Sequence, residues 1–390
     1  MKNKNIVLVY LISITRYSWF WMGIWVFYYL RFTNYSGIGL LETVLFFTSI
    51  ALEIPTGAIA DLLGKRKTII ISLFVLAFGQ FIMARSGNLT DLVISSFILG
   101  IGMAFYSGTM DAYIYDYLAE NNQQNNYDKI FSKMQTIQLI TLTLCTVIGG
   151  YIYTKNPTLP FYLNSLFTFL GAIISLFLFN LKTDNQEFSP KNFIYQTQQG
   201  FKHLFQTSIE VRRKIYLLLT IGCIFVVSTQ SLDSILGIEF GFNDRSLSIL
   251  TAAILLITSV SVQFVPKLRR KFGNIISLFL VGITGVFIYF LSPFVSILFG
   301  GLILILRQIS DSFFENLSSN VINNSVPSKF RATSISTFNM IKQLPYAVGA
   351  FFLGAIMDNI TARNFAFILG ILLLILLVAS YLNLRKNSSK

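Results

Sequence analysis

Long apolar runs separated by short polar segments dominate the chain. A helix needs about 20 mostly apolar residues to cross the hydrocarbon core of a bilayer. The runs reach that length, so the pattern predicts membrane-spanning helices rather than strands or soluble core helices. The expected spans cover residues 6–30, 38–57, 69–88, 90–117, 131–153, 159–181, 214–238, 246–266, 274–292, 294–320, 333–356 and 363–384.

The longest polar stretch, 182–213, divides these spans into two groups of six. We therefore expect an all-α membrane protein of twelve transmembrane helices, with an N-terminal six-helix bundle over 1–181 and a C-terminal one over 214–390. Phe193 and Phe201 are among the apolar residues of the stretch that recur near helical spacing. This spacing predicts a linker with an amphipathic helix on the inner membrane surface, although a flexible linker is the alternative.

Composition agrees with lipid as the main solvent of the chain. Hydrophobic residues make up 54% of the 390 residues and charged residues 12%, whereas soluble domains carry about 25% charged residues. The net charge of +13 could indicate a nucleic-acid partner. The basic residues lie in short loops between apolar runs, however, so we expect the lipid bilayer as partner and no nucleic acid.

The distribution of lysine and arginine predicts the topology. If both termini are cytoplasmic, twenty-two of the 30 basic residues fall in inner segments. Such a bias is a strong orientation signal, and it predicts a multi-pass plasma-membrane protein with both termini in the cytoplasm. The outer segments hold only Arg31, Arg85, Lys155, Arg245 and Arg363.

The loop after the second expected span has a distinctive pattern. It reads Gly57-Ala-Ile-Ala-Asp61-Leu-Leu-Gly64-Lys65-Arg66-Lys67. Its glycines permit close helix approach and a tight turn. Asp61 places an anion at the membrane edge, where it can pair with Arg66 or face a helix N-terminus. The basic residues can face anionic inner-leaflet lipid, so a loop that only sets topology is the alternative interpretation.

This loop resembles the signature loop of the major facilitator superfamily, Gly-x-x-Ala-Asp-Arg-x-Gly-Arg-Arg/Lys. Leu62 departs from it where the family usually has arginine. Segments 53–56 and 107–116 also resemble bacterial efflux-type members. The resemblance implies two pseudo-symmetric bundles, transport by alternating access, and an inner gate. The signature-loop and inner-gate candidates are Gly57, Asp61, Gly64, Lys65, Arg66, Asp111 and Asp116.

Ionisable residues within the spans are candidates for substrate or proton binding, because such groups are costly in a membrane and usually face a cavity or a partner. Arg16 lies near mid-membrane, and its alternative role is a structural pair with an acid on another span. Arg307, Asp311 and Glu315 form a stripe at helical spacing, and Arg307 could simply neutralise Asp311. The candidates are Arg16, Glu53, Asp233, Arg307, Asp311 and Lys342.

Two features typical of drug–proton antiporters in this superfamily are missing. Residues 99–105 hold no arginine, and only Gly149-Gly150 remains of the glycine pattern in the fifth span. These departures weaken the case for proton-driven drug export without affecting the resemblance to the superfamily.

We expect an efflux-type secondary transporter of a small solute, with a proton as candidate coupling ion. Alternatives are a cation-coupled nutrient symporter and, in another class, a non-transporting receptor or scaffold. A phosphate-binding glycine loop is absent and the chain holds a single histidine, so we expect no enzyme activity, no cofactor and no metal. Cys145 and Cys223 lie in apolar runs. We expect a monomer.

Overall fold

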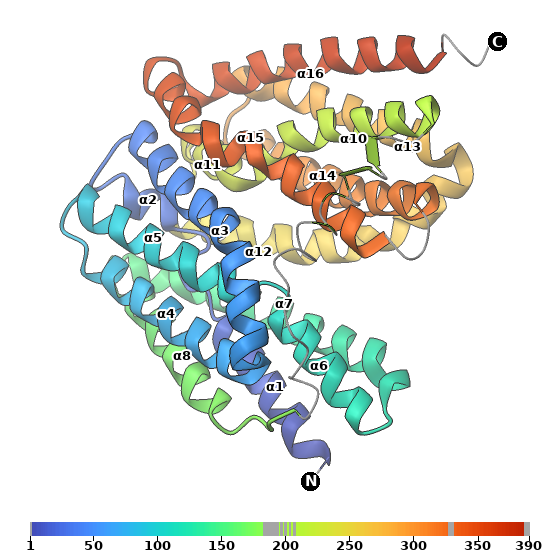
Figure 1. The fold of residues 1–390 in the computed structure, drawn as a ribbon. Coiled ribbons are helices and arrows are strands. Elements are labelled where there is room, and N and C mark those ends of the chain that lie inside the picture. The colour runs from blue at the N-terminus through green and yellow to red at the C-terminus, as the bar shows by residue number, and fades with distance from the viewer. Residues whose placement is uncertain are drawn as a thin grey trace. The chain divides into compact units, whose positions relative to one another are not determined.

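The computed structural model describes residues 2–181, 195, 198, 201–202, 204–205, 208–326 and 331–385. The side chains of 2–3, 54–55, 57–62, 210, 331–333, 381 and 383–385 lie outside this description. Within the described ranges the chain is helical and contains no strand, which confirms the all-α prediction (Figure 1). Most of the expected amphipathic linker, 182–213, lies outside the described residues.

The chain forms two compact units. Unit 1 comprises Met1–Asn192 with Asp244–Ala252, and unit 2 comprises Phe193–Asn243 with Ala253–Lys390.

Unit 1 consists of helices joined by short connections. Within it α4 packs against α5 and α8, α3 packs against α5, and α1 packs against α7 and α8. The helices are α1 (Lys2–Arg16), α2 (Trp25–Tyr29), α3 (Tyr35–Leu63), α4 (Lys65–Arg85), α5 (Leu89–Tyr106), α6 (Thr109–Glu120), the 3₁₀ turn η1 (Gln124–Asn126), α7 (Tyr127–Tyr153) and α8 (Leu159–Ser175).

Unit 2 repeats this helix-on-helix construction. Here α13 packs against α14 and α16, α10 packs against α15 and α16, and α11 packs against α14. The helices are α10 (Ile209–Val227), the π-turn η2 (Ser228–Leu232), α11 (Asp233–Phe240), η3 (Val262–Phe264), α13 (Val265–Leu291), η4 (Ser292–Phe294), α14 (Ile297–Ser325), α15 (Arg331–Asn359) and α16 (Ala362–Arg385). Helix α12 (Asp244–Ser261) is divided, with Asp244–Ala252 in unit 1 and the rest in unit 2.

Among the described residues, nine helical segments are long and apolar enough to cross a membrane by length and composition. A further apolar helix, Leu159–Ser175, is shorter. Large apolar side chains such as Phe177, Phe287 and Phe352 are exposed. Such surfaces are costly in water and are expected where lipid covers the protein. The count of twelve crossings stays a prediction.

Several expected spans are interrupted rather than continuous. The first ends as a helix at Arg16, and α2 begins only at Trp25. The fourth breaks at Gly108, which adopts a left-handed φ of +68°. The seventh contains η2, a single π-turn. Interruptions of this kind in membrane helices commonly mark binding or coupling sites, so the polar side chains near them are candidates for such sites.

Candidate functional site

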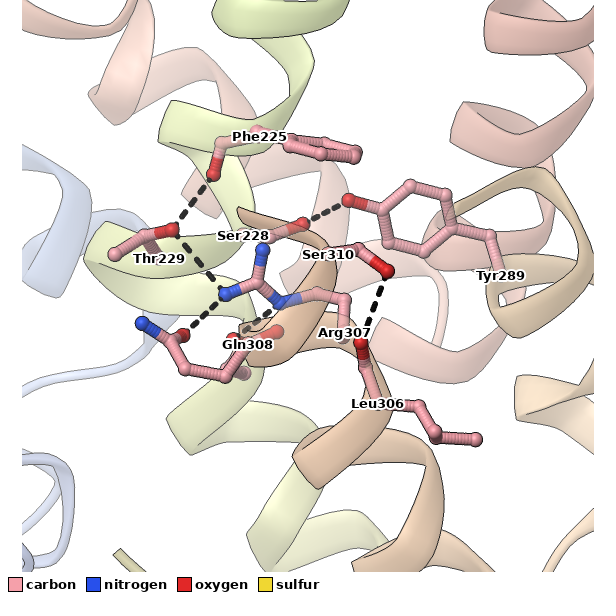
Figure 2. Close-up of polar contacts among 9 residues, drawn as sticks. Phe225, Ser228, Thr229, Tyr289, Leu306, Arg307, Gln308 and Ser310 are labelled. Carbon is pink, nitrogen blue, oxygen red and sulfur yellow. Dashed lines mark hydrogen bonds and ion pairs between the residues drawn. The ribbon is translucent and has the colours of Figure 1, made fainter. Parts of the chain in front are cut away.

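A buried charge cluster lies in unit 2, where α14 meets the π-turn of the seventh expected span. Arg307 of α14 is only 1% exposed, and its Nε lies 2.5 Å from Asp233 Oδ2. Its Nη2 donates hydrogen bonds to Thr229 Oγ1 at 3.2 Å and to Gln308 Oε1 at 2.5 Å (Figure 2). The guanidinium therefore ties α14 to both η2 and α11.

The π-turn explains how Thr229 and Asp233 reach the same guanidinium. An inserted residue widens the helix locally and re-aims the side chains around it. The turn is anchored on both sides: the Ser228 hydroxyl hydrogen-bonds the Tyr289 hydroxyl of α13, and Thr229 Oγ1 donates to the Phe225 carbonyl at 3.0 Å (Figure 2). The local distortion is therefore held by neighbours and positions the site.

Hydrogen bonding within the Arg307–Asp233 pair is incomplete. Asp233 Oδ1 and Arg307 Nη1 are buried and have no hydrogen-bond partner among the described residues. Buried polar groups are normally satisfied, and exceptions often coincide with functional sites. The two atoms leave an acceptor and a donor free for a proton, a water molecule or a solute group.

A second ion pair lies further along α14. Lys342 Nζ of α15 pairs with Glu315 Oε1. The lysine side chain is 5% exposed and the glutamate 44%. The ammonium also lies 5.8 Å from the centroid of the Phe314 ring and 5.9 Å from that of Phe338, which adds a cation–π contribution.

The cluster carries one more negative than positive charge. Its carboxylates are Asp233, Asp311 and Glu315, and its cations are Arg307 and Lys342. Each of these cations is ion-paired with another acid, which leaves Asp311, half-buried on α14, outside the ion pairs formed by the described residues. A bound proton would neutralise this excess, and an excess carboxylate in a membrane protein is a typical proton-binding group.

The stripe Arg307, Asp311 and Glu315 was expected from helical spacing, with mutual neutralisation of the first two as one interpretation. The structure instead joins Arg307 to Asp233, whereas Lys342 does reach an acid of the stripe, Glu315. Sequence reasoning did not single out Thr229, Gln308 or Tyr289, whose hydroxyl and amide groups complete the site.

In unit 1 the signature loop brings Lys65 and Asp116 together. Lys65 Nζ lies 2.6 Å from Asp116 Oδ2, and both side chains are partly exposed. Gly64 separates α3 from α4 with φ +85°, a conformation that strains other residues. The surroundings of Gly57 and the side chain of Asp61 lie outside the described part of the structure. Asp111 is exposed on α6 and forms no ion pair with another described residue.

Arg66 has a different role in the structure. It donates hydrogen bonds to Asn180 Oδ1 at 2.7 Å and to the Leu176 carbonyl, just beyond the end of α8. A cation there also complements the negative end of the helix dipole. The α8 end is thereby fastened to the start of α4.

The remaining candidates in unit 1 lie within the expected spans. Glu53 is half-buried on α3. Arg16 is 8% exposed at the end of α1, and among the described residues it forms no ion pair with an acid. The structural pair considered for Arg16 is thus not found in the described part of the chain.

Comparison with known sequences identifies relatives of low identity. The chain is 23% identical to multidrug resistance protein 1 of Bacillus subtilis over 243 residues, which is 62% of this chain and 60% of that protein. It is 23% identical to the quinolone resistance protein NorA of Staphylococcus aureus over 248 residues, again 62% and 60% of the two chains. These relatives are therefore matched over less than two thirds of their length.

Solved structures and a family profile cover more of the chain. The nucleoside transporter NupG superposes with a TM-score of 0.79 over 98% of both chains at 15% identity. A transporter of the POT family in complex with 5-aminolevulinic acid gives 0.76 over 98% of this chain and 96% of that one at 14% identity. These likenesses concern the fold alone. The profile of the Major Facilitator Superfamily matches residues 6–350, and the protein is therefore a member of that superfamily.

Proposed function

We propose that the protein is a secondary active transporter that moves a small solute by alternating access and couples this movement to protons. The observation that carries the proposal is the excess carboxylate in the cluster of unit 2: among the described residues, Asp233, Asp311 and Glu315 are accompanied by the two cations Arg307 and Lys342. Family membership supports the transport activity, and the cluster supports the coupling ion.

The geometry suggests how a proton could change the conformation. Arg307 holds α14 to α11 through Asp233, and the bond depends on a charged carboxylate. A proton on Asp233 would weaken this ionic contact, and Asp311, one helical turn from Arg307, could take over the guanidinium. The exchange of partners would let η2 and α11 move relative to α14, with the π-turn absorbing the change.

We propose a membrane arrangement from the apolar spans and from the distribution of lysine and arginine. Twelve helices would form two six-helix halves in the plasma membrane, with both termini cytoplasmic and a monomer as the working unit. The Lys65–Asp116 pair would belong to the inner gate. A partly exposed pair of this kind contributes little to stability and can therefore open and close at low cost.

We propose efflux as the direction of transport. The names of two relatives, multidrug resistance protein 1 and quinolone resistance protein NorA, support this choice. Cation-coupled uptake is the alternative function, and it requires the opposite relation between proton and solute movement.

Proteoliposomes distinguish these possibilities. Ethidium, tetraphenylphosphonium and naphthalene-1-sulfonate are suitable probes because their charges are permanent, so a pH gradient alone does not redistribute them. Antiport predicts that at least one of them accumulates in inside-acid vesicles, whereas symport requires an outside-acid gradient. Equal movement in protein-containing and protein-free vesicles under both gradients would contradict the transporter proposal and would favour a receptor or scaffold.

A further inference from the structure

The break in the first expected span places an arginine beside a row of aromatic side chains. Arg16 is the last residue of α1, and the non-helical segment that follows contains Tyr17, Trp19 and Trp21. All of these residues belong to unit 1. Arg16 is 8% exposed, so its charge is largely removed from solvent.

The aromatic residues of the break stack on one another. The ring centroids of Tyr17 and Trp19 lie 5.4 Å apart at an interplanar angle of 18°, and those of Trp19 and Trp21 lie 5.3 Å apart at 26°. These three rings are half-buried, whereas the intervening Ser18 and Phe20 are buried. The segment thus turns its even-numbered side chains inward and leaves part of the stacked rings accessible.

The segment is held rigidly in this conformation. Trp19 Nε1 donates to the Arg16 carbonyl at 2.8 Å, which caps the end of α1. Ser18 Oγ donates to the Ile14 carbonyl at 2.8 Å. The Phe20 carbonyl lies so close to Gly149 of α7 that a Cβ at position 149 would overlap it. A binding surface ordered in advance loses less entropy when a ligand binds.

Within the described part of the chain, the guanidinium of Arg16 has aromatic neighbours but no counter-ion. It lies 5.3 Å from the ring centroids of Trp19 and Tyr106 and 5.8 Å from that of Tyr17. Its buried Nε has no hydrogen-bond partner among the residues that the structure describes, and none of their carboxylates pairs with the guanidinium. Cation–π contacts offset part of the cost of burying a charge, and a hydrogen-bonded anion would offset more of it. The site therefore favours an anion.

We propose that Arg16 and the stacked rings of Tyr17, Trp19 and Trp21 form a binding subsite for an aromatic organic anion. The guanidinium fork would bind the carboxylate or sulfonate of the ligand, and its ring would stack on the exposed part of the aromatic row. The proposal names a substrate class and to that extent rests on the proposed transport function.

Equilibrium binding tests this subsite without any gradient. The full chain in nanodiscs is titrated with naphthalene-1-sulfonate, the neutral naphthalene-1-sulfonamide and the cation 1-naphthylmethylammonium, which share one ring system. We expect the sulfonate to bind about tenfold more tightly than the sulfonamide, the effect of a charge-assisted hydrogen bond. Arg16→Gln should abolish this preference and leave sulfonamide binding unchanged.

Two further variants keep the experiment decisive. Arg85→Gln removes an exposed arginine that lies over the Phe81 ring, so it should keep the full preference for the sulfonate. Trp19→Leu should weaken the sulfonate and the sulfonamide together, because both lose a stacking surface. If Arg16→Gln does not fold, the affinities of Trp19→Leu for the sulfonate and the sulfonamide still test the subsite.

The proposal is overturned if the wild-type protein binds the three compounds equally, if Arg16→Gln keeps the preference, or if Trp19→Leu binds both ring compounds as the wild type does. Any of these results would leave gradient-driven transport of other solutes unaffected. Conversely, the wild-type protein could bind the sulfonate more tightly than the sulfonamide and yet transport no solute. That result would refute the transport proposal and not the subsite.

Discussion

Removal of the carboxylate at position 233 should destabilise the protein more than removal of its cationic partner. Asp233→Asn leaves Arg307, 1% exposed, without its directly bonded carboxylate: Thr229 and Gln308 supply neutral acceptors, and Asp311 acts on the guanidinium only at longer range in this conformation. Loss of one member of a buried pair costs about 3–5 kcal/mol because an uncompensated charge stays behind. Arginine cannot escape this cost by losing its proton.

Arg307→Gln should be less harmful, because the remaining Asp233 can bind a proton and become neutral. The double variant removes both charges, so it should be more stable than Asp233→Asn alone. At 1.4 kcal/mol per factor of ten, the loss for Asp233→Asn corresponds to a decrease of about 10²–10³-fold or more in the ratio of folded to unfolded protein.

Steric trapping in bicelles measures the free energy of unfolding for the wild type, both single variants and the double variant. A double-mutant cycle then gives the coupling between positions 233 and 307. An Asp233→Asn variant within about 1 kcal/mol of the wild type, or a double variant less stable than this single one, would refute the reasoning.

Two further predictions concern unit 1, the first with a control position, Gly349, in unit 2. Gly149→Ala should cost about 1–3 kcal/mol of stability through overlap with the Phe20 carbonyl. Gly349→Ala, whose added Cβ meets no neighbour, should not lower thermal stability. Equal effects of the two substitutions in melting experiments would argue against the close packing of Gly149 on Phe20. Lys65→Gln and Asp116→Asn should each change the unfolding free energy by less than about 1 kcal/mol, because their ion pair is partly exposed; a larger loss for either would show that the pair is mainly structural.

Helix content could be predicted from the sequence because apolar length and basic loops are local signals. The expected spans 69–88 and 131–153 correspond to α4 and α7 within a few residues. The signature-loop pattern identified the superfamily, since its glycine and charge positions follow directly from the chain. Leu62, which departs from the pattern, did not prevent the identification.

Partners across the bundle could not be predicted in the same way. Helical spacing relates Arg307 only to residues of its own helix, and it therefore pointed to Asp311. The contact with Asp233 depends on the packing of α11 against α14 and on the π-turn between Ser228 and Leu232. No proline or glycine within that turn indicates the distortion.

The break after Arg16 was likewise hidden in the sequence. Residues 17–24 are mostly apolar or aromatic, and they continue the pattern of a membrane span. Aromatic residues form helices less readily than leucine or alanine, but this preference is weak. The close approach of Phe20 to Gly149 is a tertiary contact that local patterns do not reveal.

The role of the excess carboxylate is tested most directly with Asp311→Asn in proteoliposomes. Asp311 is the acid of the cluster that takes part in neither ion pair, Arg307–Asp233 or Lys342–Glu315, so its neutralisation should uncouple transport without unfolding the protein. For a solute that the wild type accumulates under a pH gradient, we predict that the variant exchanges the labelled solute across the membrane in counterflow but accumulates none. Accumulation equal to that of the wild type would contradict proton coupling at this cluster.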